Sequence, residues 1–171
     1  AENRRYLSQF SGSAGFLLIS QGNAVLATDF RYVEQAKEQA PDFEVVPIKG
    51  DISRWFPELI RRFEGERLGF EANDLSFAVH QQLIGIQSEE QNQDHREPQL
   101  IPTEGLVESI RAVKDENELA CITRAAEIAD AAVEYIASVI HPGMIEKDVA
   151  WDVERFLREN GSESLPFDII V

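Results

Sequence analysis

The feature that most constrains the fold is an alternation of short apolar runs with segments of helical period between residues 16 and 102. The runs 16–20 and 24–28 flank Gln21-Gly22-Asn23, a turn typical of a hairpin between two strands. Further strands are predicted at 43–48, 67–71 and 100–102, and helices at 30–40, 52–63 and 76–84. Phe30 is expected on the apolar stripe of the first of these helices. Ser76 is expected to cap the last one, which would bury Phe77, Val79, Leu83 and Ile84. Strands that alternate with helices predict an α/β domain.

From residue 115 the pattern changes to amphipathic helices. Asp115 and Glu118 have the spacing of a capping box at a helix start. A second helix is predicted around residues 149–157, and 167–171 is expected to begin a strand. The apolar stripe of the first helix consists of Leu119, Ile122, Ala126, Ala129, Val133, Ile136 and Ile140. Two such faces need a partner surface. We expect that partner to be a sheet that this chain does not supply, and interpret the chain as a fragment.

Charge and cysteine content exclude several classes of partner. The 16 Lys and Arg residues face 31 Asp and Glu, for a net charge of −15. Such a surface repels phosphate backbones and anionic lipids, so neither nucleic acid nor membrane partners are expected. The single cysteine, Cys121, cannot form an intramolecular disulfide, which predicts a cytoplasmic setting and a small buried side chain. Trp151 is likewise expected in a core.

No metal site is expected in this chain. His80, His95 and His141 have no nearby carboxylates at a spacing such as H-E-x-x-H. Residues 12–15, Gly-Ser-Ala-Gly, lack both the Lys of a phosphate loop and the G-x-S-x-G spacing of a nucleophile elbow. We interpret them as a tight lead into the first strand.

Asp29 and Arg31 directly follow the second strand. An Arg fork beside a carboxylate is a stiff, oriented unit. The structural interpretation is a local ion pair or cap that holds the junction of strand and helix.

Five motifs occur in the order found in Xaa-Pro aminopeptidases, prolidases and creatinase, which this chain resembles. The family patterns are YLTGFTGSAG, TDGRY…QA, lR.iKd..E, PG.tE and FD.IVA. The matching segments here are 5–15, 28–36, 110–118, 142–146 and 167–171. Two departures occur: Phe30 replaces the usual Gly, and Ile145 replaces a Thr or Ser that would cap the next helix.

The resemblance implies a creatinase-like N-terminal α/β domain over residues 1–110, a mixed sheet flanked by helices, with its first strand and helix missing. Residues 111–171 would begin a truncated pita-bread α+β catalytic domain. In that family two divalent metal ions (Mn, Co or Zn) are held by two Asp, one His and two Glu beyond the segment that matches 167–171. No catalytic or metal-binding residue is therefore expected here, and the chain alone should be inactive.

The resemblance also implies a cytoplasmic hydrolase, homodimeric through its N-terminal domain, that cleaves proline-containing peptides before proline as an aminopeptidase or dipeptidase. Asp29 and Arg31 become substrate-cleft candidates, because family dimers place N-terminal domains near neighbouring active sites. Phe167 is a third candidate, because its strand leads into the cleft, although core packing would also explain it.

Two other functions stay open. A creatinase-like enzyme would cleave a C–N bond in a small guanidino compound without a metal. A non-catalytic relative would bind peptides or proteins, as histone chaperones with a peptidase-like domain do.

Overall fold

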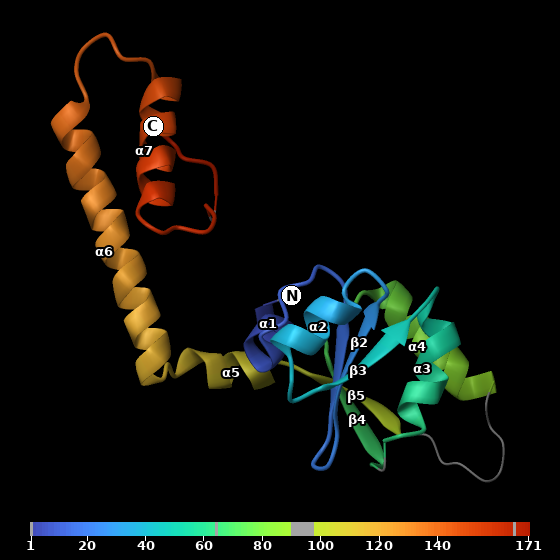
Figure 1. Cartoon of the computed structure of the whole chain (residues 1–171). Coiled ribbons are helices and arrows are strands. Elements are labelled where there is room, and N and C mark those ends of the chain that lie inside the picture. The colour runs from blue at the N-terminus through green and yellow to red at the C-terminus, as the bar shows by residue number, and fades with distance from the viewer. Residues whose placement is uncertain (1, 64, 90–97, 166) are drawn as a thin grey trace. The chain divides into compact units, whose positions relative to one another are not determined.

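The computed structural model describes the 171-residue chain except for residues 1, 64, 90–97 and 166. The chain divides into two compact units, residues 1–112 and 113–171, which are treated separately below (Figure 1). No helix among the described residues is both long and apolar enough to cross a membrane.

A mixed three-stranded sheet forms the first half of unit 1. Its elements are α1 (Glu2–Ser8), β1 (Phe16–Ile19), β2 (Ala24–Asp29), α2 (Val33–Gln39) and β3 (Glu44–Ile48). The predicted hairpin is confirmed, since β1 runs antiparallel to β2 and places Leu17 opposite Leu26. Strand β3 is parallel to β2 because the connection between them crosses over through α2. The core of this half contains Phe10, Leu26, Ala36 and Ala40.

A parallel pair of strands forms the second half. Its elements are α3 (Ile52–Ile60), β4 (Arg67–Glu71), α4 (Phe77–Glu89), β5 (Gln99–Thr103) and α5 (Leu106–Ala112). Helices α3 and α4 share a core of Ile52, Phe56, Ile60 and Leu83.

Helix α4 begins as predicted but buries a different face. The backbone N–H of Val79 donates to Ser76 Oγ at 3.3 Å, which confirms Ser76 as a cap. Leu83 is buried and Val79 packs against the same core, whereas Phe77 and Ile84 are exposed. The prediction that all four are buried is wrong, because at 100° per residue positions 77 and 84 lie opposite positions 79 and 83.

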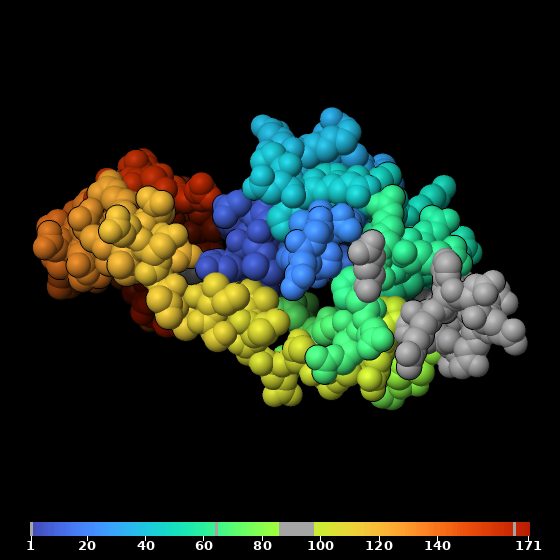
Figure 2. Space-filling model, turned by 90° about the horizontal axis from the view of Figure 1, so that it is seen from below, coloured from blue at the N-terminus to red at the C-terminus, as the bar shows by residue number. Residues whose placement is uncertain are grey.

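Helices α1 and α5 were not predicted, because each has only seven residues and no clear apolar stripe. They lie side by side at the surface of unit 1 (Figures 1 and 2). Arg111 Nη1 donates to Asn3 Oδ1 at 2.7 Å, and Asn3 Nδ2 donates to Glu108 Oε1 at 2.7 Å. The same amide donates to Glu71 on β4. These bonds join segments about 70 to 110 residues apart, which no local sequence pattern reveals.

Unit 2 consists of α6 (Glu116–Val139) and α7 (Glu146–Glu159). The predicted capping box is confirmed: Glu118 N–H donates to Asp115 Oδ1 at 2.8 Å, and Asp115 N–H donates to Glu118 Oε2 at 2.9 Å. The rings of Tyr135 and Phe156 stack between the helices with centroids 4.7 Å apart. Ile145 precedes α7 and makes no side-chain capping bond.

Two helices alone cover only their shared seam, so most of the predicted apolar stripe is uncovered within the described residues. The exposed large apolar side chains of unit 2 are Val113, Leu119, Ile122, Val133, Ile140, Ile145, Trp151, Phe167, Ile170 and Val171. The predictions that Trp151 and Cys121 are buried are wrong for this reason. The predicted strand at 167–171 is also wrong, because no described strand pairs with this segment.

Candidate functional site at the β2–α2 turn

The turn between β2 and α2 holds two of the predicted site residues together. Tyr32 N–H donates to Asp29 O at 3.1 Å and closes a four-residue turn. Arg31 binds the Asp29 carboxylate through two bonds, Nε to Oδ1 at 3.0 Å and Nη2 to Oδ2 at 2.7 Å. Arg31 N–H also donates to Oδ1 at 3.0 Å. The predicted local ion pair is therefore confirmed.

The electrostatics of the turn follow from this fork. The hydrogen bond from Arg31 lowers the pKa of Asp29, and the same bond raises the pKa of Arg31. The side chains are 26% exposed for Asp29 and 59% exposed for Arg31, so solvent screens their attraction. The pair consequently orients the guanidinium more than it stabilises the fold.

Ser13 and Tyr32 extend the site, and sequence reasoning did not assign them. Ser13 Oγ lies 2.7 Å from Tyr32 OH, and this hydrogen bond lowers the pKa of Tyr32. The Arg31 guanidinium lies 5.2 Å from the centre of the Tyr32 ring. The glycine-rich motif that contains Ser13 was the available signal, but only the folded chain brings it to Tyr32.

The glycine-rich segment does lead into β1 as predicted. Thr28 Oγ1 donates to Ala14 O at 2.7 Å, and Ser11 N–H donates to Gln39 Oε1 at 2.9 Å. The segment is thus fastened to β2, and the residue just before it to α2.

Phe30 projects from the same turn and is 83% exposed. Its predicted place on the apolar stripe of the following helix is wrong, because that helix begins only at Val33. Phe167, the third predicted cleft residue, belongs to unit 2 and is 71% exposed. Core packing therefore does not explain Phe167 within the described residues.

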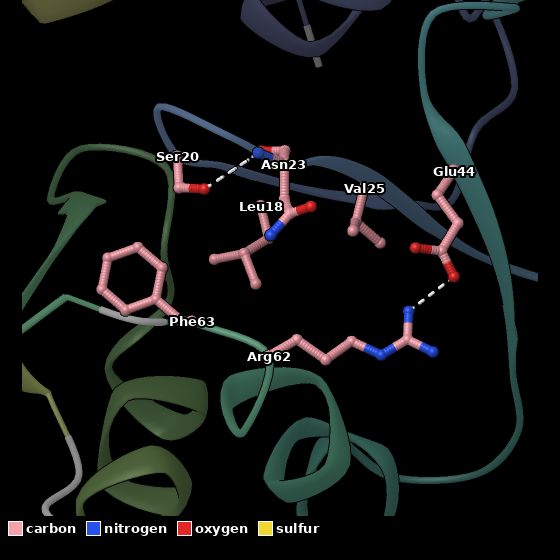
Figure 3. A pocket seen from close by; sticks show the side chains of 7 residues that line it. All are labelled: Leu18, Ser20, Asn23, Val25, Glu44, Arg62 and Phe63. Atoms are coloured by element: carbon pink, nitrogen blue, oxygen red, sulfur yellow. Dashed lines mark hydrogen bonds and ion pairs between the residues drawn. The ribbon is translucent and has the colours of Figure 1, made fainter.

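A small pocket elsewhere in unit 1 contains none of these residues. It has a volume of about 230 Å³ and is lined by Leu18, Ser20, Asn23, Val25, Glu44, Arg62 and Phe63. Arg62 extends toward Glu44 and forms an ion pair at 2.6 Å, while Phe63 and Ser20 lie at the other end (Figure 3). Pockets that hold organic ligands are typically about 300–1,000 Å³. We therefore place the candidate site at the turn.

The described residues do not fit a metal centre. No group of three or more His, Cys, Asp or Glu in this part of the chain has suitable geometry. The His80 ring packs beside Phe70 with centroids 5.1 Å apart, and His141 Nδ1 lies 3.1 Å from Pro142 O. His95 lies outside the described residues.

Comparisons with known proteins identify the α/β unit described above as the N-terminal domain of a creatinase-type protein. Residues 1–113 match the model of the creatinase/prolidase N-terminal domain, and residues 120–171 match that of metallopeptidase family M24. The chain belongs to the creatinase/prolidase family of M24 metallopeptidases. The resemblance and the fold class expected from the sequence are confirmed.

Individual relatives point the same way. "Uncharacterized peptidase YqhT" of Bacillus subtilis is 35% identical over 169 residues, which are 99% of this chain and 46% of the relative. An Xaa-Pro dipeptidase structure from Bacillus anthracis has 37% identity and a TM-score of 0.82, covering 95% of this chain and 43% of that one. An X-Pro aminopeptidase from Thermotoga maritima has 30% identity and a TM-score of 0.83, covering 98% and 45%. The chain thus spans about half the length of each of these three relatives.

Proposed function

We propose that this chain is the N-terminal part of a metal-dependent Xaa-Pro peptidase, a hydrolase that cleaves peptides before proline. The observation that carries the proposal is the match of two consecutive segments to the two family models in one chain. The likeness to an Xaa-Pro dipeptidase and an X-Pro aminopeptidase supports the proline specificity. In this proposal unit 1 shapes the substrate cleft and supports a cytoplasmic homodimer.

The residues that bind the two divalent ions (Mn, Co or Zn) are proposed to lie outside this chain, which would be inactive alone. The uncovered apolar faces of α6 and α7 support this division, because a larger M24 domain would give them a partner surface. No chemical step is assigned to a residue described here.

The turn at 29–32 is proposed to face the cleft of the neighbouring subunit. Asp29 engages two of the five N–H donors of the Arg31 side chain and holds the guanidinium in one orientation. A fixed, half-exposed guanidinium suits a peptide carboxylate or carbonyl. Phe167 is proposed to line the pocket for the residue before proline.

The activity is tested by expressing the complete open reading frame that contains this sequence. With Mn²⁺, Co²⁺ or Zn²⁺ we expect release of the N-terminal residue from Ala-Pro or Ala-Pro-Ala, and no cleavage of Ala-Ala-Ala. The ratio of the two proline substrates separates a dipeptidase from an aminopeptidase. Absence of proline-dependent cleavage with every metal would refute the proposal, and cleavage of creatine would favour the C–N hydrolase.

Arg31→Ala in that protein tests the role of the turn. We expect kcat/KM to fall at least about tenfold, because the loss of one charge-assisted hydrogen bond corresponds to about 1.4 kcal/mol, with only a small fall in Tm. Lys37→Ala is the matched control: Lys37 is 58% exposed, pairs with Glu34 on α2 and should leave kinetics unchanged. Unchanged kinetics with a lowered Tm would leave Arg31 a structural role only.

The oligomeric state is tested by light scattering on the chain itself. If unit 1 mediates the dimer, the mass in solution should be twice the 19.3 kDa of one chain. A monomer at 100 µM would count against dimerisation through this domain.

A further inference from the structure

We infer that Arg4 is a positioning residue for the candidate site: from α1 it holds the loop that presents Ser13 to Tyr32. Arg4 Nη1 donates to Gly15 O at 2.8 Å, and Nη2 donates to Gly12 O. These two bonds fasten both ends of the Gly12–Gly15 loop to one planar group. That Tyr32 matters to a substrate rests on the proposed function, whereas the control of its geometry by Arg4 does not.

Phe10 connects Arg4 to the aromatic side of the site. The Arg4 guanidinium lies 5.6 Å from the centre of the Phe10 ring, and that ring meets Tyr32 edge-on at 5.9 Å and 81°. Phe10 is fully buried, and Gly12 lies so close to it that a Cβ on Gly12 would be 2.2 Å from Phe10 Cζ. The loop therefore has little freedom between the guanidinium and the ring.

The cost of placing Arg4 here favours a positioning role. Its Nε is buried and has no hydrogen-bond partner among the described residues. A buried donor without a partner destabilises the fold. The arginine is retained at this position despite that unpaired donor, and a planar fork that reaches two carbonyls at once is a property that only Arg has.

A change at Arg4 should also affect Arg31, through Ser13 and Tyr32 rather than through direct contact between the two arginines. Ser13 lies within the loop that Arg4 fastens, and its hydroxyl is 2.7 Å from Tyr32 OH. The Tyr32 ring in turn lies beneath the Arg31 guanidinium. If the loop loosens, the Tyr32 side chain should lose its fixed position first. The Arg31 guanidinium should then lose its orientation over the ring.

The titration of Tyr32 in the intact chain measures this coupling. The chain has three tyrosines, so NMR of ¹³Cζ-labelled tyrosine gives three signals, and Tyr32→Phe assigns one of them. In the parent chain the bond from Ser13 lowers the pKa of Tyr32, with Arg31 lowering it further and Asp29 raising it. Ser13→Ala should raise this pKa, and the size of that rise is the reference for the Arg4 variants.

Arg4→Met should raise the pKa of Tyr32 in the same direction as Ser13→Ala, and the double variant should raise it no further. Arg5→Met is the matched control, since Arg5 is exposed on the same helix, and should leave the titration unchanged. A Tyr32 titration that moves in Ser13→Ala but not in Arg4→Met would overturn the inference. If Arg4→Met does not fold, Arg4→Lys is used instead, because it replaces the planar fork with a single ammonium group. A rise in the pKa of Tyr32 in Arg4→Lys supports the inference, and an unchanged pKa refutes it.

Kinetics of the complete enzyme separate this inference from the proposed function. Arg4→Met and Ser13→Ala should lower kcat/KM by a similar factor, non-additively. If the Tyr32 signal shifts while kcat/KM stays unchanged, Arg4 positions the loop but the turn has no part in the reaction.

Discussion

Gly12→Ala should be among the most destabilising single-methyl additions to unit 1. A Cβ at Gly12 would lie 2.2, 2.8 and 2.9 Å from three carbons of the Phe10 ring. Carbon atoms in contact normally sit about 3.5–4.0 Å apart. The ring would have to move by more than about 1 Å, yet it is fully buried against Leu26, Ala36 and Ala40.

The magnitude follows from the packing. Overpacking a core costs about 1–3 kcal/mol, and three contacts this short place Gly12→Ala near 3 kcal/mol. The backbone contributes no strain of its own, because Gly12 is not among the residues with positive φ. At about 4 °C per kcal/mol for a unit of this size, the Tm should fall by roughly 12 °C.

Urea unfolding followed by tryptophan fluorescence measures this loss. Trp55 packs against the core of unit 1, and Trp151 lies in unit 2. In a Trp151→Phe background the signal therefore reports unit 1 alone. The midpoint should fall without a change in the slope of the transition.

Two further variants test whether the clash with the Phe10 ring causes the loss of stability. Gly22→Ala is the control, because no atom beyond Gly22 and its two chain neighbours lies within 4 Å of its Cβ position, and it should change the free energy of unfolding by less than about 0.5 kcal/mol. In a Phe10→Leu background Gly12→Ala should cost much less, because the clashing ring is gone. An equal cost in both backgrounds, or a loss below about 0.5 kcal/mol in the parent, would refute the steric explanation.

Three other predictions concern caps and charge. Asp115→Ala removes the capping box of α6 and should destabilise unit 2 by about 1 kcal/mol, seen as a lower Tm by circular dichroism; an unchanged Tm would contradict it. Ile145→Thr supplies the missing cap of α7 and should stabilise unit 2 by up to about 1 kcal/mol, with slower amide exchange in its first turn; faster exchange would count against the capping geometry. The Arg31 bond lowers the folded-state pKa of Asp29, so its stabilisation is present above about pH 4 and is lost as the pH falls through the lower folded value. The Tm of Arg31→Met should therefore fall less steeply below about pH 4 than the Tm of the parent chain. An equally steep fall would disprove the contribution of this ion pair.

The local features of this chain could be predicted because each depends on neighbours in sequence. The hairpin at Gly22 follows from a turn between two apolar runs, and the capping box at Asp115 follows from two polar residues three positions apart. The ion pair of Asp29 with Arg31 spans two residues. The same capping box predicts that a helix begins just after Asp115, and α6 does begin at Glu116.

The rest required the folded chain, because it depends on which faces meet. Side-chain burial in α4 and α7 was mispredicted for Phe77 and Trp151, since an apolar residue is buried only if another element covers its face. The predicted strand at 167–171 failed for a related reason, since a strand needs a paired neighbour.

The sequence by itself determined the family, the order of the elements from β1 to β5 and the charged pair at Asp29 and Arg31. Only the tertiary structure decided that Ser13 meets Tyr32 and that Arg4 holds the loop between them. The physical reason is that a hydrogen bond between distant segments depends on how the core around Phe10 packs, and that packing is a property of the whole unit.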